Sequence, residues 1–280
     1  MGRFDDWAII SDIDNTLVVH GIMTVSDANK EAIDYWRSEG GIFTFATGRY
    51  LGGALKLCQD LNVTLPFIYN NGSAIYLPES QQFTSVLHLG EGILSILPKI
   101  KSAFPFCGIA GYNEETMFLI QEDDLLRRHF KRQNLAPKFL ENEALLPSFC
   151  KVLITIESEK MSDLKQFMSS IHNVSYQFSQ STPDFFEITP FGATKGAQLS
   201  NLCQLLNVSP EKVITVGDNE NDISFLKASK NSFAVANATK EALCAAQHIT
   251  NARGDTESAF PEIIKKLESI IGKESNHGQI

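Results

Sequence analysis

The sequence has 280 residues, of which 43% are hydrophobic, and a formal net charge of −9. A chain of this length and apolar content can bury one large or two ordinary domains without disulfides or oligomerisation. Its negative charge argues against nucleic acids and anionic membranes as partners, because both bind basic surfaces. We therefore expect no nucleic-acid and no membrane partner. We also expect the protein to be a monomer or a weak homodimer.

Cysteine spacing and apolar runs bear on the compartment. The five cysteines are scattered and show no spacing typical of zinc or redox pairs, so we expect reduced thiols. No apolar run reaches the roughly 18 residues that a membrane span needs. The first residues lack the basic and apolar stretches of a secretory leader. These features predict a cytoplasmic protein.

Strand and helix patterns alternate in the first part of the chain. A short apolar run at 7–11 precedes a helical pattern at 26–38, a strand at 41–46, a helix at 50–61 and a strand at 66–70. Loops of only a few residues join these segments. This alternation predicts an α/β domain with a Rossmann-like parallel sheet covered by helices.

The pattern changes at about Phe83. Isolated strand patterns and separate helical segments follow, at 93–104, 116–121, 123–133 and 151–157. After about Glu187 the alternation resumes, at 194–206, 212–217, 221–229, 232–235 and 240–246. We therefore predict an α+β domain at 83–187, inserted into a discontinuous core domain of 1–82 and 188–280. The polar residues 272–280 are expected to be disordered.

Two aspartates, Asp12 and Asp14, directly follow the first predicted strand. Ligands bind at the carboxyl ends of strands in open α/β sheets. Two carboxylates this close require a shared cation or proton, and hard oxygen ligands suit Mg²⁺. A solvated acidic turn is the alternative explanation of this segment alone.

A second acidic cluster, with Asp218, Asn221 and Asp222, follows the apolar strand at 213–216 and opens a helix. Its carboxylates can complete an octahedral oxygen site with Asp12. By itself it is equally a helix N-cap. Two acidic clusters at strand ends of one core favour the metal site.

Groups suited to phosphate occur at two further positions. Thr47, Gly48 and Arg49 end a strand and precede a helix, where a hydroxyl and backbone N–H groups can hold a phosphate. Lys195 starts the helix after the insertion, an unfavourable place for a cation unless an anion lies nearby. A capping Thr with a turn Gly, and a surface lysine, are the alternatives.

Taken in order, the motifs are D-x-D-x-T from Asp12, T-G-R from Thr47, T-K-G from Thr194 and G-D-x-x-N-D from Gly217. This set resembles the haloacid dehalogenase superfamily of phosphohydrolases. The insertion between the second and third motifs, with Asn71-Gly72 and Ala236-Asn237-Ala238, is similar to the Cof-type branch and its large α/β cap. Asn15, where most Cof-type sequences carry Gly, also makes the first motif look like the sucrose-phosphate phosphatase group. The resemblance covers roughly 7–75 and 187–260.

The resemblance implies a role for each matching residue. Asp12 matches the nucleophile, and Asp14 the general acid and base that also offers a backbone carbonyl to the metal. Asp218 matches a metal ligand, and Asp222 and Asn221 match residues that support or bind it. Phosphate contacts are implied for Thr47 and Lys195, and we expect further contacts from Gly48, Arg49 and Asn71.

The implied function is a Mg²⁺-dependent phosphatase that hydrolyses a small phosphorylated metabolite, with a sugar phosphate expected from the family's habits. A dehalogenase is disfavoured because it has no use for Asp14 and a metal at Asp218. A phosphosugar mutase and a non-catalytic sugar-phosphate binding protein remain alternatives.

The inserted domain supplies the leaving-group contacts in this family. The candidates here are the basic run Arg127, Arg128, His129, Lys131 and Arg132, and the segment Asp184-Phe185-Phe186-Glu187. The basic run fits a solvated helix face better than a pocket.

Overall fold

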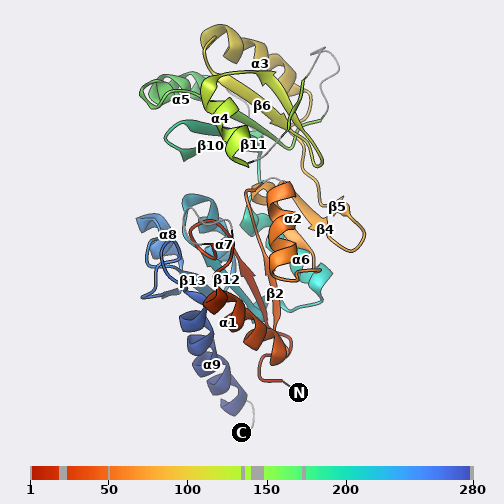
Figure 1. Cartoon of the computed structure of the whole chain (residues 1–280), viewed down its shortest axis with the longest axis vertical. Helices are drawn as coiled ribbons and strands as arrows, with labels where there is room; N and C mark the ends of the chain where they lie inside the picture. The colour runs from red at the N-terminus through yellow and green to blue at the C-terminus, as the bar shows by residue number, and fades with distance from the viewer. Residues whose placement is uncertain are drawn as a thin grey trace. The chain divides into compact units, whose positions relative to one another are not determined.

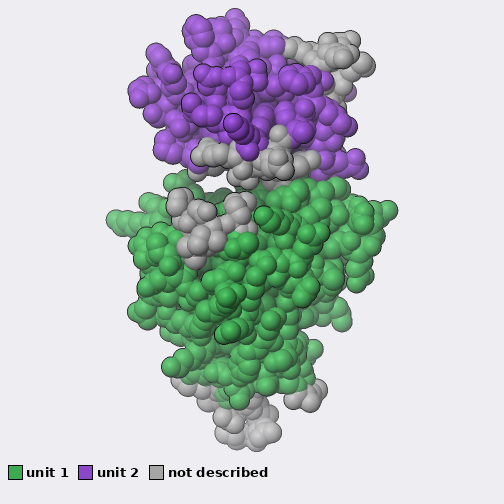
Figure 2. All heavy atoms as spheres, viewed as in Figure 1, with its two compact units in different colours: residues 1–85, 194–280 green, residues 86–193 purple. Residues whose placement is uncertain are grey.

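The structure, a computed structural model, describes residues 2–18, 24–49, 51–133, 136–139, 148–171 and 175–277. It divides into two compact units, which are coloured separately in Figure 2. Unit 1 comprises residues 1–85 and 194–280, and unit 2 comprises residues 86–193. Both boundaries lie slightly later in the chain than the predicted ones, at 82 and 187.

Unit 1 is built on a five-stranded sheet in the order β14-β13-β12-β1-β2, and all its strand pairs are parallel. The strands are β1 (Ala8–Ser11), β2 (Ile42–Phe45), β12 (Val213–Gly217), β13 (Asn231–Ala234) and β14 (His248–Ile249). Every residue of β1 and β12 is buried, as expected for a sheet covered on both faces.

Helices cover both faces of this sheet (Figure 1). They are α1 (Asp27–Ser38), α2 (Leu51–Asp60), α6 (Lys195–Leu206), α7 (Ile223–Ala228), α8 (Lys240–Ala245) and α9 (Phe260–His277). Ala8 and Ile10 of β1 pack in one cluster with Leu202 of α6 and Phe225 of α7. On another side of the sheet, Phe43 of β2 meets the ring of Phe260 edge-on, at 5.8 Å.

The prediction that 66–70 continues the parallel sheet is right for one bridge only, in which Ile68 pairs parallel with Ala46 and accepts a hydrogen bond from Thr47 N–H at 2.9 Å. β3 (Phe67–Tyr69) pairs antiparallel with β4 (Ala74–Leu77), which pairs with β5 (Gln82–Thr84) in a separate three-stranded sheet. A turn at Asn70–Gly72 reverses the chain, and both Asn71 (φ 58°) and Gly72 (φ 98°) adopt left-handed conformations there. Such conformations suit Asn and Gly, so the reversal was encoded locally.

The expected disorder at 272–280 is also wrong for 272–277, because α9 runs to His277. The last three residues lie outside the described part of the chain. Ile263, Ile264, Leu267 and Ile271 recur at helical spacing and are all buried. This apolar stripe holds the helix against the unit, and packing of this kind supplies most helical stability in proteins.

Unit 2 has a six-stranded sheet in the order β10-β11-β9-β6-β7-β8. Its strands are β6 (Gly108–Tyr112), β7 (Met117–Gln121), β8 (Lys138–Phe139), β9 (Lys151–Thr155), β10 (Tyr176–Thr182) and β11 (Phe185–Pro190). Its helices are α3 (Gly92–Ala103), α4 (Asp124–Gln133) and α5 (Met161–Ser169). Because β11 extends to Pro190 between β9 and β10, the unit continues past residue 187.

None of the five cysteines forms a disulfide, and all except Cys244 are buried. Among the helices of the described residues, none is both long and apolar enough to cross a membrane.

Candidate active site

The two strands that precede the acidic motifs, β1 and β12, are neighbours in the sheet. Their carboxyl ends therefore lie side by side. Ser11 of β1 is in register with Val216 of β12. Asp12 follows β1 directly, and its N–H donates to the carbonyl of Val216 at 2.8 Å. Asp218 follows β12 in the same way. Parallel pairing thus places the two acidic motifs at one edge of the sheet, as the sequence predicted.

Lys195, the first residue of α6, contacts both acidic motifs. Its ammonium group donates to the carboxylate of Asp12 and, at 2.6 Å, to Oδ1 of Asp222. The side chain of Lys195 is fully buried, and so is that of Asp222. Thr194 caps α6 by accepting a hydrogen bond from Ala197 N–H at 3.1 Å, which fixes where the lysine leaves the helix.

Asp218 and Asp222 are positioned by local hydrogen bonds. Thr16 donates its hydroxyl to Asp218 Oδ1 at 2.9 Å. Asp222 Oδ2 accepts from the N–H groups of Asp218 and Asn219, at 3.0 and 3.1 Å. Asp222 therefore caps the turn Glu220–Asp222 and binds Lys195 with its other oxygen. The N-cap that the sequence analysis gave as the alternative is therefore present as well: Asn219 is the N-cap of this turn, and Asp222 completes its capping box.

Burial and like charges dominate the electrostatics of this cluster. Burial raises the pKa of Asp12 well above its usual range, Lys195 opposes this, and the carboxylates of Asp222 and Asp218 add to it. Burial and then Asp222 raise the pKa of Asp218 to about 7. Burial alone would lower the pKa of Lys195, but the charges of Asp12 and Asp222 outweigh it and raise that pKa. The lysine is therefore charged, and three carboxylates share it.

Asp14 lies apart from this cluster and has a cation of its own. Arg49 grips its carboxylate with two hydrogen bonds, Nε to Oδ2 at 2.9 Å and Nη2 to Oδ1 at 2.6 Å. The sequence argument, that Asp12 and Asp14 share a cation or a proton, stays a prediction. In the structure their side chains are served separately, by Lys195 and Arg49, because the chain turns between them and β2 brings Arg49 to the outer carboxylate.

The remaining predicted phosphate residues gather around Asn71. Asn71 N–H donates to the carbonyl of Thr47 at 2.9 Å, and its side-chain oxygen accepts from Asn221 at 2.9 Å. A Cβ on Gly48 would lie 2.7 Å from that same oxygen, so a larger residue there would displace the Asn71 amide. Asn221 is thus linked to the Thr47 loop, and its role as a metal ligand stays a prediction.

The donor set fits a hard divalent cation. Asp12, Asp218 and Asp222 are buried, and each offers one oxygen within 4.8 Å of the other two. Three carboxylates facing one lysine leave uncompensated negative charge away from water, which is costly unless a cation or protons balance it. An all-oxygen set of this kind is what Mg²⁺ prefers.

One supporting contact was not assigned a role in the sequence analysis. Asn237, after β13, donates to the carbonyl of Asn15 at 2.9 Å and accepts from Gly254 N–H at 2.6 Å. Asn15 itself has a left-handed backbone (φ 60°), which Asn tolerates better than most residues. Asn237 therefore links the loop between Asp12 and Thr16 to the segment at Gly254. Its position just after a strand was the feature of the sequence that could have indicated this role.

The candidate residues of unit 2 contact one another within that unit. Arg127 is exposed and pairs with Glu122 at 3.0 Å and Asp124 at 2.5 Å, as expected for a solvated helix face. His129 meets the ring of Phe185 edge-on at 5.0 Å, which joins the basic run to the Asp184–Glu187 segment. In that segment Glu187 is buried and lies 3.7 Å from Lys151, a buried cation that the sequence analysis missed. The side chain of Arg132 lies outside the described residues.

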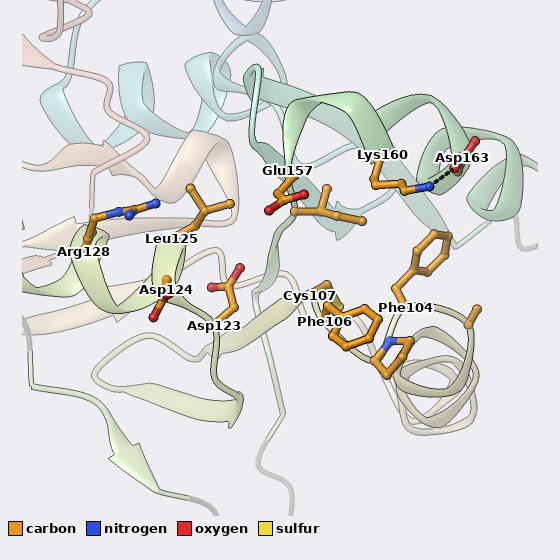
Figure 3. A pocket seen from close by; sticks show the side chains of 13 residues that line it. Phe104, Phe106, Cys107, Asp123, Asp124, Leu125, Arg128, Glu157, Lys160 and Asp163 are labelled. Atoms are coloured by element: carbon orange, nitrogen blue, oxygen red, sulfur yellow. Dashed lines mark ion pairs between the residues drawn. The ribbon is translucent and has the colours of Figure 1, made fainter.

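Unit 2 also contains a pocket of about 690 Å³ between the end of α3, the start of α4 and the segment after β9 (Figure 3). Arg128 is the member of the basic run that lines it, with Asp123, Glu157 and Lys160 among its other polar residues. Phe106 on its wall is 91% exposed. The pocket forms where three segments distant in sequence meet, so no local pattern indicated it.

Comparison with known proteins places this geometry in a family. The family model of haloacid dehalogenase-like hydrolases matches residues 9–258. YxeH of Bacillus subtilis, which carries a provisional name as a phosphatase, is 26% identical over 272 residues, covering 92% of this chain and 97% of its own. YwtE of the same organism, named a 5-amino-6-(5-phospho-D-ribitylamino)uracil phosphatase, is 24% identical and covers 90% and 95%.

Solved structures show the same fold. TM0651 of Thermotoga maritima superposes with a TM-score of 0.81 at 22% identity, covering 93% of this chain and 97% of its own. The structure of BT4131, described as a subclass IIB sugar phosphatase of the same superfamily, gives 0.79 at 18% identity, covering 94% and 99%. This chain belongs to the haloacid dehalogenase-like hydrolase family. The family is the one that the motif order implied, and relatives such as YxeH and YwtE carry names as phosphatases.

Proposed function

We propose that this phosphatase is Mg²⁺-dependent, hydrolyses the phosphate monoester of a sugar or sugar-like polyol, and passes the phosphoryl group through Asp12. The observation that carries the proposal is the contact of buried Asp12 with buried Lys195 inside a cluster of three carboxylates. A carboxylate beside a fixed cation at the carboxyl end of a strand is well placed to attack a bound phosphate.

Each step uses a side chain described above. A carboxylate oxygen of Asp12 attacks phosphorus and displaces the alkoxide, which takes a proton from Asp14. Asp14 then takes a proton from water as the water oxygen attacks phosphorus, which breaks the bond to Asp12 and releases phosphate. Lys195 stays charged throughout, because Asp12 and Asp222 raise its pKa. It therefore offsets the negative charge of the transferring group.

Asp12 and Asp218, with Asp222, would hold Mg²⁺, and the backbone carbonyl of Asp14 is a further expected ligand. Bound there, the ion would neutralise charge on the phosphate oxygens.

Arg49 supports phosphate recognition. Its side chain is only 10% exposed, and among the described residues its Nη1 is a buried donor without a hydrogen-bond partner. Two of its nitrogens hold Asp14, so the third is free to donate to a phosphate oxygen. A buried donor without a partner is costly, and a bound anion would satisfy it.

Substrate class, partners and compartment are part of the proposal. The named activities of YwtE, on a phosphorylated ribityl compound, and of BT4131, on sugar phosphates, support a phosphorylated sugar or polyol. The net charge of −9 supports the absence of nucleic-acid and membrane partners. The free cysteines support a reducing cytoplasm, and we propose a monomer or weak homodimer there.

The test is a panel of phosphorylated metabolites with Mg²⁺ present and then chelated. We expect release of inorganic phosphate from sugar or polyol phosphates, lost on chelation and in Asp12→Asn. Isomerised product from a bisphosphorylated sugar, without phosphate release, would instead identify a mutase. Binding of sugar phosphates with no turnover under any condition would identify a binding protein.

A further inference from the structure

A second group of metal-binding side chains lies in unit 2. His88, Glu114 and Cys150 each present one ligand atom, and these three atoms lie within 4.8 Å of one another. His88 Nε2 is 2.5 Å from Glu114 Oε1. The carboxylates of the candidate active site belong to unit 1, whereas all three residues of this group belong to unit 2.

Backbone hydrogen bonds hold the three segments together. Leu89, next to His88, donates its N–H to the carbonyl of Phe149 at 2.8 Å. Cys150 donates its N–H to the carbonyl of Tyr112 at 2.7 Å. The turn after Tyr112, which carries Glu114, is closed by the side chain of Asn113, which accepts from two backbone N–H groups at 3.0 and 2.6 Å. The convergence is therefore set by the main chain and not by side-chain rotamers alone.

The three ligands differ in kind, and this points to one class of ion. An imidazole nitrogen, a carboxylate oxygen and a cysteine sulfur are all ligands of Zn²⁺, whereas Mg²⁺ and Ca²⁺ prefer oxygen alone. Ligand atoms around tetrahedral zinc are roughly 3–4 Å apart, given bond lengths of about 2.0–2.3 Å. The His88–Glu114 contact of 2.5 Å has to open by about an ångström, and the other two separations are at most 4.8 Å.

Burial decides how such a site would open to solvent. Cys150 is fully buried, while the side chains of His88 and Glu114 are 38% and 20% exposed. Solvent can therefore reach the group from the histidine side and supply a fourth ligand. Burial, with the charge of Glu114 adding to it, raises the pKa of the Cys150 thiol. Zn²⁺ would displace that proton, because thiolate is the binding form.

We propose that His88, Glu114 and Cys150 form a zinc site in unit 2, with water as the fourth ligand. Binding releases the thiol proton and links the segment before α3, the β6–β7 turn and the start of β9. The ion adds stability to unit 2 in proportion to the logarithm of its concentration over its dissociation constant.

The test uses Co²⁺ as a spectroscopic probe of the whole protein, with excess Mg²⁺ to occupy oxygen-only sites. A thiolate bound to Co²⁺ gives a charge-transfer band in the near ultraviolet, and the carboxylates of unit 1 contain no sulfur to produce one. We expect the band to saturate at about one equivalent of Co²⁺, the stoichiometry of one three-ligand site, and Zn²⁺ to abolish it. Cys150→Ser should remove the band, whereas Cys107→Ser, buried in the same unit, and Cys244→Ser, the exposed thiol, should keep it.

Two further variants keep the test decisive if Cys150→Ser does not fold. His88→Asn and Glu114→Gln each remove one ligand at a partly exposed position and should weaken Co²⁺ binding at least about tenfold, since even second-shell changes cost that much. A folded wild-type protein without the band would overturn the proposal. So would a band that disappears in Cys244→Ser, or unchanged affinity in both partly exposed variants.

Discussion

Arg49 grips the carboxylate of Asp14 with two parallel hydrogen bonds, and the guanidinium is nearly buried while the carboxylate is 58% exposed. The pair joins the T-G-R loop to the D-x-D loop. Arg49, a candidate phosphate-binding residue, therefore also positions the proposed general acid and base.

Arg49→Lys tests this double role. Lysine cannot make the paired hydrogen bonds or reach phosphate with a third donor. We expect KM for the best substrate to rise about 10- to 100-fold, since a charge-assisted hydrogen bond contributes about 1.5–3 kcal/mol. Steady-state kinetics will measure it. An unchanged KM would show that Arg49 does not contact the phosphate.

Asp12→Asn and Asp218→Asn should each abolish Mg²⁺-dependent turnover. The first removes the nucleophile and a metal ligand, and the second removes a ligand. The matched control is Asp34→Asn, an exposed aspartate on α1 that should retain full activity. If Asp12→Asn kept more than about a hundredth of wild-type turnover with deamidation excluded, the covalent route through Asp12 would be wrong.

Asp14→Asn separates the two proton transfers. Nitrophenolate leaves without a proton, so the variant should release about one equivalent of nitrophenol per site and then stall as a phosphoenzyme. A sugar phosphate should give almost no burst, because its alkoxide needs the missing acid. Rapid-quench kinetics and intact mass will report both results. Steady nitrophenyl phosphate turnover near the wild-type rate would exclude Asp14 as the base, and equal bursts from the two substrates would exclude it as the acid.

Stability without divalent cations should fall as the pH rises from about 4 to about 7. Carboxyl groups in unfolded chains titrate near pH 4, whereas the folded protein raises the pKa of Asp12 and brings that of Asp218 to about 7. The folded state thus holds more protons in this window, and raising the pH favours unfolding. Mg²⁺ competes with these protons, so the rise in melting temperature that it causes should grow from pH 6 to pH 8. A rise independent of pH would place the ion elsewhere.

Lys195→Met should destabilise the protein by about 3–5 kcal/mol at neutral pH, because it leaves buried carboxylates without their cation. Adding Asp222→Asn should recover part of that loss, since it removes one of the unpaired charges. Denaturant unfolding in metal-free buffer will measure both changes, with the exposed Lys227→Met as the control. Purely additive effects would mean that Lys195 and Asp222 do not interact energetically.

The clustering of the candidate residues was predictable because short motifs and parallel strands determine their positions together. Asp12, Asp218 and Thr47 each follow a strand, and a parallel sheet brings such ends to one edge whatever the rest of the chain does. The alternation of strand and helix patterns predicted the α/β core, its interruption predicted the inserted domain, and the order of the motifs predicted the family. It also named Lys195 and Asp222 as site residues.

The pairing of these residues depended on the tertiary structure. Folding pairs Asp12 with Lys195 and Asp14 with Arg49, and the motifs did not indicate these partners. Tertiary structure also decided that the strand at 66–70 meets the parallel sheet through a single bridge and otherwise pairs antiparallel in the β3–β4 hairpin. His88, Glu114 and Cys150 have no informative spacing in the sequence, and only the packing of three segments in unit 2 brings their ligand atoms together. Local patterns report a strand end or a cap, but a side chain's partner is set by long-range contacts.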